Sequence, residues 1–302
     1  IKDRSLRYFL YGVGTENLYH EIEIKKRNGG IRKICAPEDK LKNIQRKMLH
    51  ILEEVYRKKP AAYGFINDKS NVSNAQNHCK RELILNIDLK DFFDQIHFGR
   101  VFGLLKKEPY SIGEEAAKVI AQLVCYKGKL PQGAPTSPII SNMICSPLDT
   151  QLTQLAKRYK LVYTRYADDF QISSKYSFSF TEIQDVIVSI LNKFGAPFTI
   201  NSAKTRYGSS AGQNWNLGLM LNKDNEITVG HKKKRQFQAM LSSYVMDRKN
   251  GIAWDKSDIQ TMEGYRNYYR MVEREKIDGI VKHLSDKFGV DIVKAIKEDL
   301  AA

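Results

Sequence analysis

Hydrophobic and polar positions in the first part of the chain follow the two spacings that distinguish strands from helices. Residues 19–26 and 31–36 alternate in polarity around Asn28, Gly29 and Gly30. This predicts a β-hairpin, because glycine accepts the positive φ of a tight turn. The next apolar residues recur at helical spacing and predict an amphipathic helix: Leu41, Ile44, Met48, Ile51, Leu52 and Val55.

A short apolar run and a proline mark two further elements. Residues 83–88 form an apolar run that ends in an acid, which predicts a buried strand with Asp88 at its end. Ser137 precedes Pro138 in the pattern of an N-cap and a first helical turn. We therefore expect a helix from there to about Tyr159.

The remaining elements indicate the fold class. Residues 161–166 and 170–174 predict the two strands of a second hairpin. Further helices are expected over 98–107, 113–126, 181–194 and the C-terminal third, and further strands near 198–201, 215–221 and 226–229. Strands scattered among helices, without regular parallel βαβ units, predict an α+β fold with an antiparallel sheet and helices packed on one face.

Composition narrows the class of protein. The 302 residues are 42% hydrophobic and 27% charged, as expected of an ordered globular chain, and the net charge is +15. A basic chain attracts polyanions, with nucleic acid as the leading partner. On charge alone, a basic protein without such a partner fits equally well, so motifs must decide.

Cysteine spacing and the lack of a long apolar run predict a cytoplasmic protein with free thiols. Cys35, Cys79, Cys125 and Cys145 lie too far apart for a Cys-x-x-Cys metal site or a compact disulfide framework. No stretch approaches the roughly eighteen apolar residues of a membrane span, so we expect no membrane partner. A first residue of Ile1 rather than Met suggests that a short upstream segment is missing.

Two adjacent acids occupy a position that a tight turn does not favour. Residues 166–169 read Tyr-Ala-Asp-Asp between two apolar strands, so the turn would place Asp168 and Asp169 at its tip. Such turns favour Asn-Gly or Asp-Gly. Two carboxylates about 4 Å apart repel by roughly 4 kcal/mol at an effective dielectric constant near 20. A divalent cation would reverse that repulsion, so we expect a metal site here.

Asp88 is the third candidate acid. It ends the 83–88 strand and would meet Asp168 and Asp169 if that strand pairs with the hairpin. Three carboxylates with two Mg²⁺ ions support in-line phosphoryl transfer, in which one ion activates the attacking hydroxyl and the other stabilises the leaving pyrophosphate. The alternative, acids solvated on surface turns, weakens when all three are taken together.

The segments that carry these acids resemble blocks of a known enzyme family. Residues 86–93, Asn-Ile-Asp-Leu-Lys-Asp-Phe-Phe, resemble the first catalytic block of reverse transcriptases, and residues 166–169 resemble their YxDD box. Residues 130–138, 201–205 and 217–219 resemble further blocks in the same order. The resemblance implies an RNA-directed DNA polymerase with a right-hand fold of fingers, palm and helical thumb. It also implies which residues hold two catalytic Mg²⁺ ions: Asp88, Leu89, Asp168 and Asp169.

The same resemblance assigns the surroundings of an incoming deoxynucleoside triphosphate (dNTP). It implies Lys25, Arg32 and Lys204 for the triphosphate, Gln132 and Gly133 for the nucleotide and template pocket, and Phe93 for the aromatic gate that rejects a 2′-hydroxyl. Local sequence leaves alternatives open. The Gln-Gly pair also fits a plain turn, Lys204 fits a solvated surface position, and Phe92 and Phe93 both fit the core.

One further segment resembles retron reverse transcriptases in particular. Residues 74–78, Asn-Ala-Gln-Asn-His, match their NAxxH element upstream of the first catalytic block. The resemblance implies that Asn74 and His78 bind RNA, while the local alternative is a capped helix with a surface histidine. A second retron signature, Val-Thr-Gly, is replaced at 216–218 by Asn-Leu-Gly and keeps only the glycine.

A basic cluster opens the helical C-terminal third. Four successive cations oppose the dipole of the predicted helix that follows them: Lys232, Lys233, Lys234 and Arg235. Phosphate binding would explain them, and three nearby aromatic residues would stack on RNA bases: Tyr265, Tyr268 and Tyr269. A solvated basic face with buried tyrosines is the alternative for each residue.

The resemblance divides the chain into fingers, palm and thumb and implies a biological role. Fingers would comprise 1–83 with 105–130, palm 84–104 with 131–228, and thumb 229–302. A retron-type enzyme would copy part of its own structured non-coding RNA from a guanosine 2′-hydroxyl, giving branched msDNA, and would act in anti-phage defence with a separate effector protein. The alternatives are another bacterial reverse transcriptase, group II intron-like or of abortive-infection type, and a non-catalytic RNA-binding scaffold.

Overall fold

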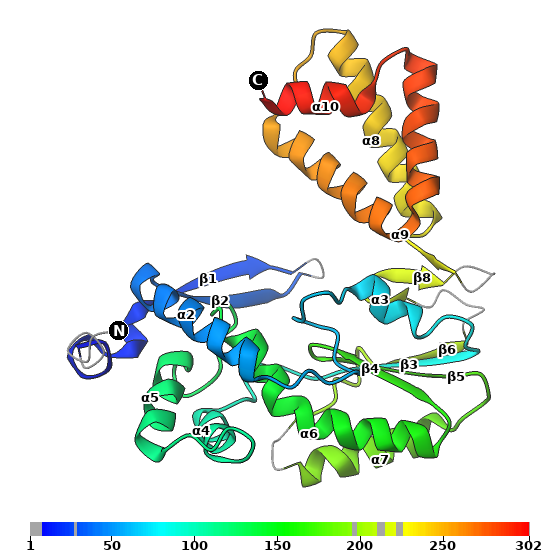
Figure 1. Cartoon of the computed structure of the whole chain (residues 1–302). Helices are drawn as coiled ribbons and strands as arrows, with labels where there is room; N and C mark the ends of the chain where they lie inside the picture. Colours follow the sequence, from blue (N-terminus) through cyan, green and yellow to red (C-terminus); the bar gives the residue numbers. More distant parts are fainter. Residues whose placement is uncertain (1–7, 27–28, 195–197, 210–214, 222–225, 302) are drawn as a thin grey trace. The chain divides into compact units, whose positions relative to one another are not determined.

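The computed structural model describes residues 8–26, 29–194, 198–209, 215–221 and 226–301 (Figure 1). Two positions used above, Ile1 and the turn residue Asn28, lie outside these ranges. The chain forms two compact units, Ile1–Ser70 with Leu85–Tyr207 and Asn71–Ile84 with Gly208–Ala302. Each unit has its own hydrophobic core.

A four-stranded sheet carries the first unit. Its strands are β3 (Leu83–Asp88), β4 (Val162–Tyr166), β5 (Asp169–Ser174) and β6 (Arg206–Ser209), in the order β4-β5-β3-β6. β4 and β5 are an antiparallel hairpin, which confirms the pairing predicted from the two apolar runs. β3 lies beside β5, so the strand that ends at Asp88 is a neighbour of the strand that begins at Asp169.

Helices α6 (Ser137–Arg158) and α7 (Phe180–Lys193) run along one face of this sheet (Figure 1). Both supply side chains to the same core as the strands. The expected cap of α6 was wrong by one residue: Thr136 is the N-cap and Ser137 is already helical. The Ser137 hydroxyl instead donates to the Pro131 carbonyl at 2.6 Å and so closes the loop before the helix.

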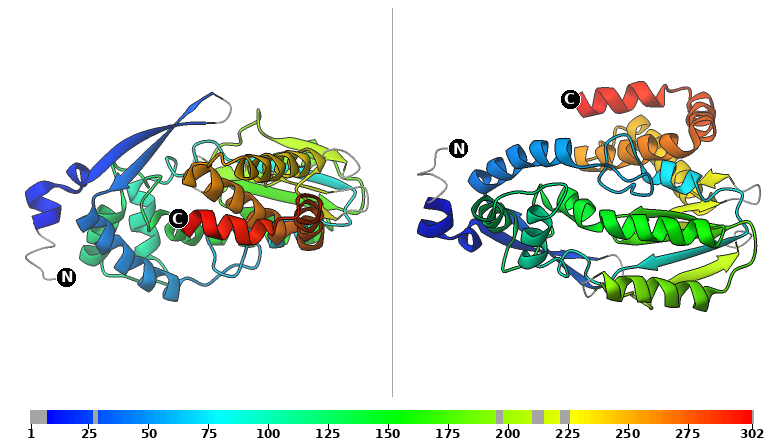
Figure 2. Two further views of the ribbon diagram at one scale, coloured as in Figure 1. Left: turned by 90° about the horizontal axis from the view of Figure 1, so that it is seen from above. Right: turned by 60° about the horizontal axis from the view of Figure 1, so that its bottom comes forward.

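A hairpin, three α-helices and two short helical segments complete the described part of the first unit (Figure 2). β1 (Tyr19–Lys25) and β2 (Ile31–Pro37) pair antiparallel, as predicted. The predicted helices are also present as α2 (Asp39–Val55), α4 (Phe98–Lys106) and α5 (Glu114–Val124), and two short helices precede β1: η1 (Tyr8–Val13) and η2 (Thr15–Leu18). A small core joins the base of the hairpin to α2 and α5: Leu18, Tyr19, Leu41, Ile44, Leu123, Tyr126 and Ala134.

The second unit combines a small sheet with the C-terminal helices. Its elements are α3 (Asn71–Gln76), β7 (Trp215–Asn216), β8 (Leu219–Leu221), β9 (Ile227–Thr228), α8 (His231–Lys249), α9 (Lys256–Phe288) and α10 (Ile292–Ala301). The helical C-terminal third is therefore confirmed. α9 packs against both α8 and α10 and is kinked at Glu273, where φ is −139° and ψ is 64°.

Two strand predictions need correction. The single strand expected over 215–221 is a hairpin, β7 and β8, because Leu217 and Gly218 both adopt positive φ, at 51° and 79°. The strand expected near 198–201 is only an isolated bridge between Leu89 and Ile200, and the strand on that edge of the sheet is β6. In the described part of the chain, no helix has the length and apolar character needed to cross a membrane.

Candidate active site

A two-residue turn between β4 and β5 presents the paired acids. Tyr166 pairs with Asp169 across the hairpin, so Ala167 and Asp168 are the central residues of the turn and Asp169 opens β5. Ala167 has a φ of 56°, a conformation that costs a residue other than glycine about 1–3 kcal/mol. Such strain persists only where the surroundings enforce it, and it is frequent at active sites.

Asp88 is joined to this turn through the backbone. The amide of Leu89 donates to the carbonyl of Asp168 at 3.1 Å. The carbonyl of Asp88 accepts from the amide of Asn201 at 2.8 Å, which ties the strand end to the following loop as well. Folding therefore brings the early acid beside the later pair, as the pairing of β3 with the hairpin requires.

The carboxylate of Asp88 is held by two side chains from the loop after α7. Asn201 Nδ2 donates to Asp88 Oδ1 at 2.9 Å, and Lys204 Nζ lies 3.0 Å from the same oxygen. Lys204 was predicted as a nucleotide ligand, whereas Asn201 was not singled out. The signal for Asn201 was its place at the start of the 201–205 block, three residues before Lys204.

The electrostatics of the turn favour a bound cation. Burial, together with the neighbouring charges of Asp168 and Asp88, raises the pKa of Asp169 to about 7. Burial also raises the pKa of Asp168, with Asp88 adding to the effect and Lys204 opposing it. A positive ion close to carboxyl groups that resist ionisation for these reasons stabilises their ionised form.

A cavity of about 500 Å³ opens next to the acids. Its wall contains Asp88 and Asp168 together with cations and with the loop before α6: Lys26, Arg32, Lys33, Lys90, Lys127, Lys129, Gln132 and Lys204. Acidic and basic side chains thus line the same cavity. This charge arrangement suits a ligand that carries both metal ions and phosphate oxygens.

The three acids supply the hard oxygen donors that Mg²⁺ prefers, and the pKa values of Asp168 and Asp169 are raised by burial although Lys204 opposes the rise. Leu89, the fourth predicted ligand, has only main-chain atoms to offer. Within the described ranges, no group of three or more His, Cys, Asp or Glu side chains is placed to hold a metal ion. The Asp88 carboxylate faces Lys204 and Asn201, so metal binding requires it to exchange one partner for another.

The sequence as a whole matches known proteins. Residues 24–240 match the family model described as "Reverse transcriptase (RNA-dependent DNA polymerase)". The retron Ec73 reverse transcriptase of Escherichia coli is 32% identical over 267 residues, which cover 83% of this chain and 82% of the relative. The chain belongs to the retron reverse transcriptases. It is therefore an RNA-directed DNA polymerase.

Two further retron reverse transcriptases are similar to this chain in sequence. Ec86 of Escherichia coli is 28% identical over 285 residues, which cover 94% of this chain and 85% of the relative. Mx65 of Myxococcus xanthus is 31% identical over 256 residues, and the match covers 78% of this chain and 58% of that longer relative.

Solved structures show the fold. Apo telomerase from Candida tropicalis superposes with a TM-score of 0.54 at 14% identity, over 94% of this chain and 62% of the telomerase chain. Telomerase from Candida albicans, solved with the TWJ fragment of telomeric RNA, gives a TM-score of 0.50 over 93% of this chain and 60% of the other. The retron reverse transcriptase thus has the α+β right-hand fold that its motifs implied.

The two predicted cations of the first hairpin face different sides. Lys25 stands opposite Ile31 and Arg32 stands opposite Ile24, and residues that alternate along a strand point to opposite faces. Arg32 lines the cavity, as do Lys26 and Lys33 of the same hairpin, whereas Lys25 does not contribute to its wall. The role of Lys25 as a triphosphate ligand stays a prediction.

Packing against neighbouring segments places both Gly133 and Phe93. Gly133 has a φ of 121°, and a Cβ there would come within 2.9 Å of the Cys35 carbonyl, so its missing side chain makes room for β2. Phe92 is core, whereas Phe93 is half-buried with its ring centroid 6.2 Å from that of Phe65. The structure separates the two phenylalanines, which the sequence did not.

Asn74 and His78 are buried rather than presented to a ligand. Both have 0% exposed surface. Asn74 lies in α3, whose Val72 and Ala75 pack in the core of the second unit, and His78 lies in the turn that follows this helix. Burial lowers the pKa of His78 to about 3, so its imidazole is neutral. Direct RNA contact by these two side chains, and equally a surface histidine, are incompatible with their burial. The motif instead anchors α3 within the second unit.

Of the four cations at the start of α8, two bind neighbouring groups of the protein and two are exposed. Lys234 forms an ion pair with the buried Glu273 at 2.9 Å, and Lys233 donates to the Gly218 carbonyl at 2.8 Å. Although burial alone would raise the pKa of Glu273, hydrogen bonds from Thr228 and Lys234 hold it below its usual value. Lys232 and Arg235 are exposed, so these are the two cations presented to solvent.

Proposed function

We propose that Asp88, Asp168 and Asp169, with the main chain of Leu89, bind two Mg²⁺ ions and that this enzyme incorporates dNTPs at the cavity beside them. The observation that carries the proposal is the hydrogen bond from the Leu89 amide to the Asp168 carbonyl, which joins the separate acid-bearing segments. The ions, when bound, would activate the attacking hydroxyl and stabilise the leaving pyrophosphate.

The chain's own cations would bind the triphosphate. Lys204 and Arg32 lie on the cavity wall with Lys26, and guanidinium and ammonium groups form strong charge-assisted bonds with phosphate oxygens. Lys204 would release Asp88 to the metal and turn toward the triphosphate, which its exposed side chain permits. Gln132 would line the pocket for the nucleotide and template, Gly133 would complete that loop, and Phe93 would act as the sugar gate.

Structured non-coding RNA is the proposed template and partner. The net charge of +15 and the exposed Lys232 and Arg235 at the start of α8 support binding of a polyanion. Tyr265, 37% exposed, is the tyrosine of its group best placed to stack on a base, since Tyr269 is buried and Tyr268 accepts a hydrogen bond from Asn71.

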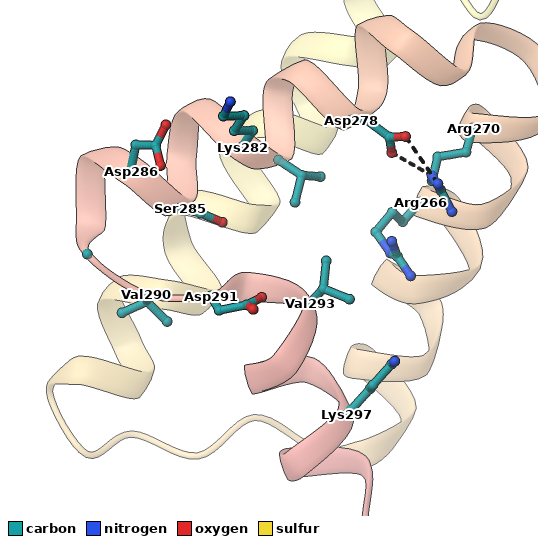
Figure 3. A pocket seen from close by; sticks show the side chains of 12 residues that line it. Arg266, Arg270, Asp278, Lys282, Ser285, Asp286, Val290, Asp291, Val293 and Lys297 are labelled. Atoms are coloured by element: carbon teal, nitrogen blue, oxygen red, sulfur yellow. Dashed lines mark hydrogen bonds and ion pairs between the residues drawn. The ribbon is translucent and has the colours of Figure 1, made fainter.

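A second hollow of about 970 Å³ in the C-terminal helices is less suited to RNA (Figure 3). Its lining alternates cations with acids, and Arg270 is held by Asp278, as the dashed lines show. Arg266 is likewise held by Glu263. Cations that already have carboxylate partners offer less to a phosphate.

We also assign residues 1–83 with 105–130 to the fingers, 84–104 with 131–228 to the palm and 229–302 to the thumb. The compact units support two changes to this division, because residues 71–84 and 208–228 both group with the C-terminal third. The α3 segment would then belong functionally with the thumb.

The enzyme would begin synthesis at the 2′-hydroxyl of a guanosine in its own RNA, make branched msDNA, and serve anti-phage defence with a separate effector protein. Its relatedness to retron reverse transcriptases supports this proposal. The test is to express the chain with its neighbouring non-coding RNA, sequence the nucleic acid that co-purifies, and treat it with a 2′,5′-debranching enzyme. Release of a DNA strand only after debranching is expected. A DNA product with an ordinary 3′,5′ primer junction would point to a conventionally primed enzyme instead.

A further inference from the structure

A buried ion pair lies beside the turn that carries Asp168 and Asp169. Arg165, in β4, and Asp149, on α6, have side chains with 0% exposed surface. Arg165 Nε donates to Asp149 Oδ1, and Arg165 Nη2 donates to Asp149 Oδ2, each at 2.8 Å. Two parallel bonds fix the plane of the guanidinium as well as its position.

The remaining guanidinium bonds reach the turn and its support. Arg165 Nη1 donates to the Ala167 carbonyl at 3.1 Å, and Nη2 also donates to Asn142 Oδ1 at 3.0 Å. Asn142 Nδ2 in turn donates to the Gly64 carbonyl at 2.9 Å. A Cβ at Gly64 would come within 2.5 Å of the Ala167 amide nitrogen, so this segment packs directly on the turn.

Stability alone is a weak reason for this arrangement. Burying two charges costs solvation, and well-packed apolar residues in place of a buried ion pair are often as stable or more stable. The pair does, however, aim a charged donor at the carbonyl of Ala167, the residue that holds the strained positive φ. A donor that is fixed in direction can hold a backbone conformation that the residue itself disfavours.

We propose that Arg165, oriented by Asp149 and Asn142, is a positioning residue for DNA synthesis. It holds Ala167 in its left-handed conformation and thereby sets the directions of the Asp168 and Asp169 carboxylates for metal binding. The inference rests on the proposed function, because it takes these two acids as metal ligands. Lysine would not replace Arg165, since a point charge lacks the planar fork that binds Asp149 and Ala167 together.

The test compares the double variant Arg165→Met/Asp149→Leu with Tyr163→Phe, both in the full chain bound to its RNA. The double variant removes the pair without leaving one buried charge alone. Tyr163→Phe is the matched control, because the Tyr163 hydroxyl donates to Asp149 Oδ1 at 2.9 Å and makes no bond to the turn. Single-nucleotide incorporation is measured as kcat and KM for dNTP against Mg²⁺ concentration, together with the thermal unfolding temperature and RNA affinity.

For the double variant we expect kcat to fall about a hundredfold, as for a misplaced catalytic group, and the Mg²⁺ concentration for half-maximal rate to rise about tenfold or more. KM for dNTP, RNA affinity and unfolding temperature should change little, and Tyr163→Phe should change the rate by less than about threefold. A double variant with the wild-type rate and Mg²⁺ requirement, or an equal loss in Tyr163→Phe, would overturn the proposal.

Arg165→Lys decides the matter if the double variant does not fold. It keeps a positive charge against Asp149 but not the fork, so we expect a raised Mg²⁺ requirement here too, and a wild-type requirement would refute the positioning role. An Asp168→Asn/Asp169→Asn variant measured in parallel separates the two proposals. Loss of incorporation in that variant with normal Arg165 variants would leave the metal site standing and remove only the positioning role.

Discussion

Two ion pairs contact the acid-bearing segments, and they differ in their access to water. The Arg165 and Asp149 side chains are both 0% exposed, whereas Lys204 is 59% exposed and Asp88 is 11% exposed. Arg165 reaches the Ala167 carbonyl, while Lys204 faces a carboxylate that we propose as a metal ligand. One pair is part of the protein interior and the other lies on the cavity wall.

The difference shows how one active site combines an ion pair of fixed geometry with an ion pair that can change partners. A dry, bidentate pair has no competing solvent and holds one geometry. A solvated ammonium on a flexible stem is screened and gives up its partner at little cost. We infer that the buried pair sets where the acids point, and the exposed pair leaves Asp88 open to exchange Lys204 for a metal ion.

The largest expected effect comes from the paired acids of the turn. Asp168→Asn/Asp169→Asn should lower nucleotide incorporation by about a thousandfold or more, because metal ions supply several kcal/mol of transition-state stabilisation. RNA affinity, measured by filter binding, should be nearly unchanged. Asp185→Asn, an exposed acid on α7, is the control and should retain full activity. A double variant that still extends primers would refute the metal assignment.

Removing one partner of the buried ion pair should have the largest effect on the stability of the fold. Asp149→Ala leaves the Arg165 guanidinium buried without its carboxylate, so the free energy of unfolding should fall by about 3–5 kcal/mol. Urea denaturation measures it. A loss below about 1 kcal/mol would mean that the interior pair behaves like a surface pair and would remove the contrast drawn here.

The exposed pair should show the opposite profile. Lys204→Ala should change the free energy of unfolding by less than about 1 kcal/mol, because the lysine is largely solvated. It should lower kcat/KM for dNTP by about ten- to a hundredfold, since one charge-assisted bond to the triphosphate is lost. Steady-state kinetics checks this, with Lys157→Ala, an exposed lysine on α6, as the control.

A smaller effect concerns how the stability of the folded enzyme depends on pH. Burial and the neighbouring acids raise the folded-state pKa of Asp169 to about 7, above the unfolded value of about 3.9. The folded state therefore binds the proton more tightly, and stability without metal should fall as pH rises from about 4 to about 7. Differential scanning fluorimetry in EDTA should show this slope, and Mg²⁺ should restore more stability at about pH 8 than at about pH 5.

Asp169→Asn is the variant that isolates this titration. Its unfolding temperature in EDTA should depend less on pH than that of the wild type over the same window. If the two slopes are equal, Asp169 does not titrate near neutrality in the folded enzyme, and the electrostatic case for a bound cation at this turn is lost.

Local patterns predicted the elements that place the acids. The apolar run before Asp88 and the two runs around Asp168 and Asp169 were enough to predict these strands and the hairpin, because both signals are short-range. The pairing of the Asp88 strand with that hairpin was only a condition in the sequence and is a finding of the structure. The ends of the helices and strands, and the faces to which their side chains point, were less predictable. Of the two cations predicted on the first hairpin, Arg32 lines the cavity and Lys25 does not, a difference that depends on how the hairpin pairs.

Features that depend on tertiary packing were not visible in the sequence. Gly133 and His78 are defined by distant neighbours, β2 in one case and the core of the second unit in the other. Arg165 did carry a signal, a charge in the middle of an otherwise uncharged strand next to the paired acids. Its partners on α6 were not predictable, since nothing local joins Asp149 or Asn142 to that strand.

The most direct test of the central claim is to locate the metal. Crystals of the enzyme with a primed template and a non-hydrolysable dNTP analogue, grown in Mn²⁺, would reveal bound ions by anomalous scattering. We predict two ions about 3.5–4 Å apart, coordinated by Asp88, Asp168 and Asp169. Mn²⁺ bound elsewhere, with these three carboxylates outside its coordination shell, would contradict the account.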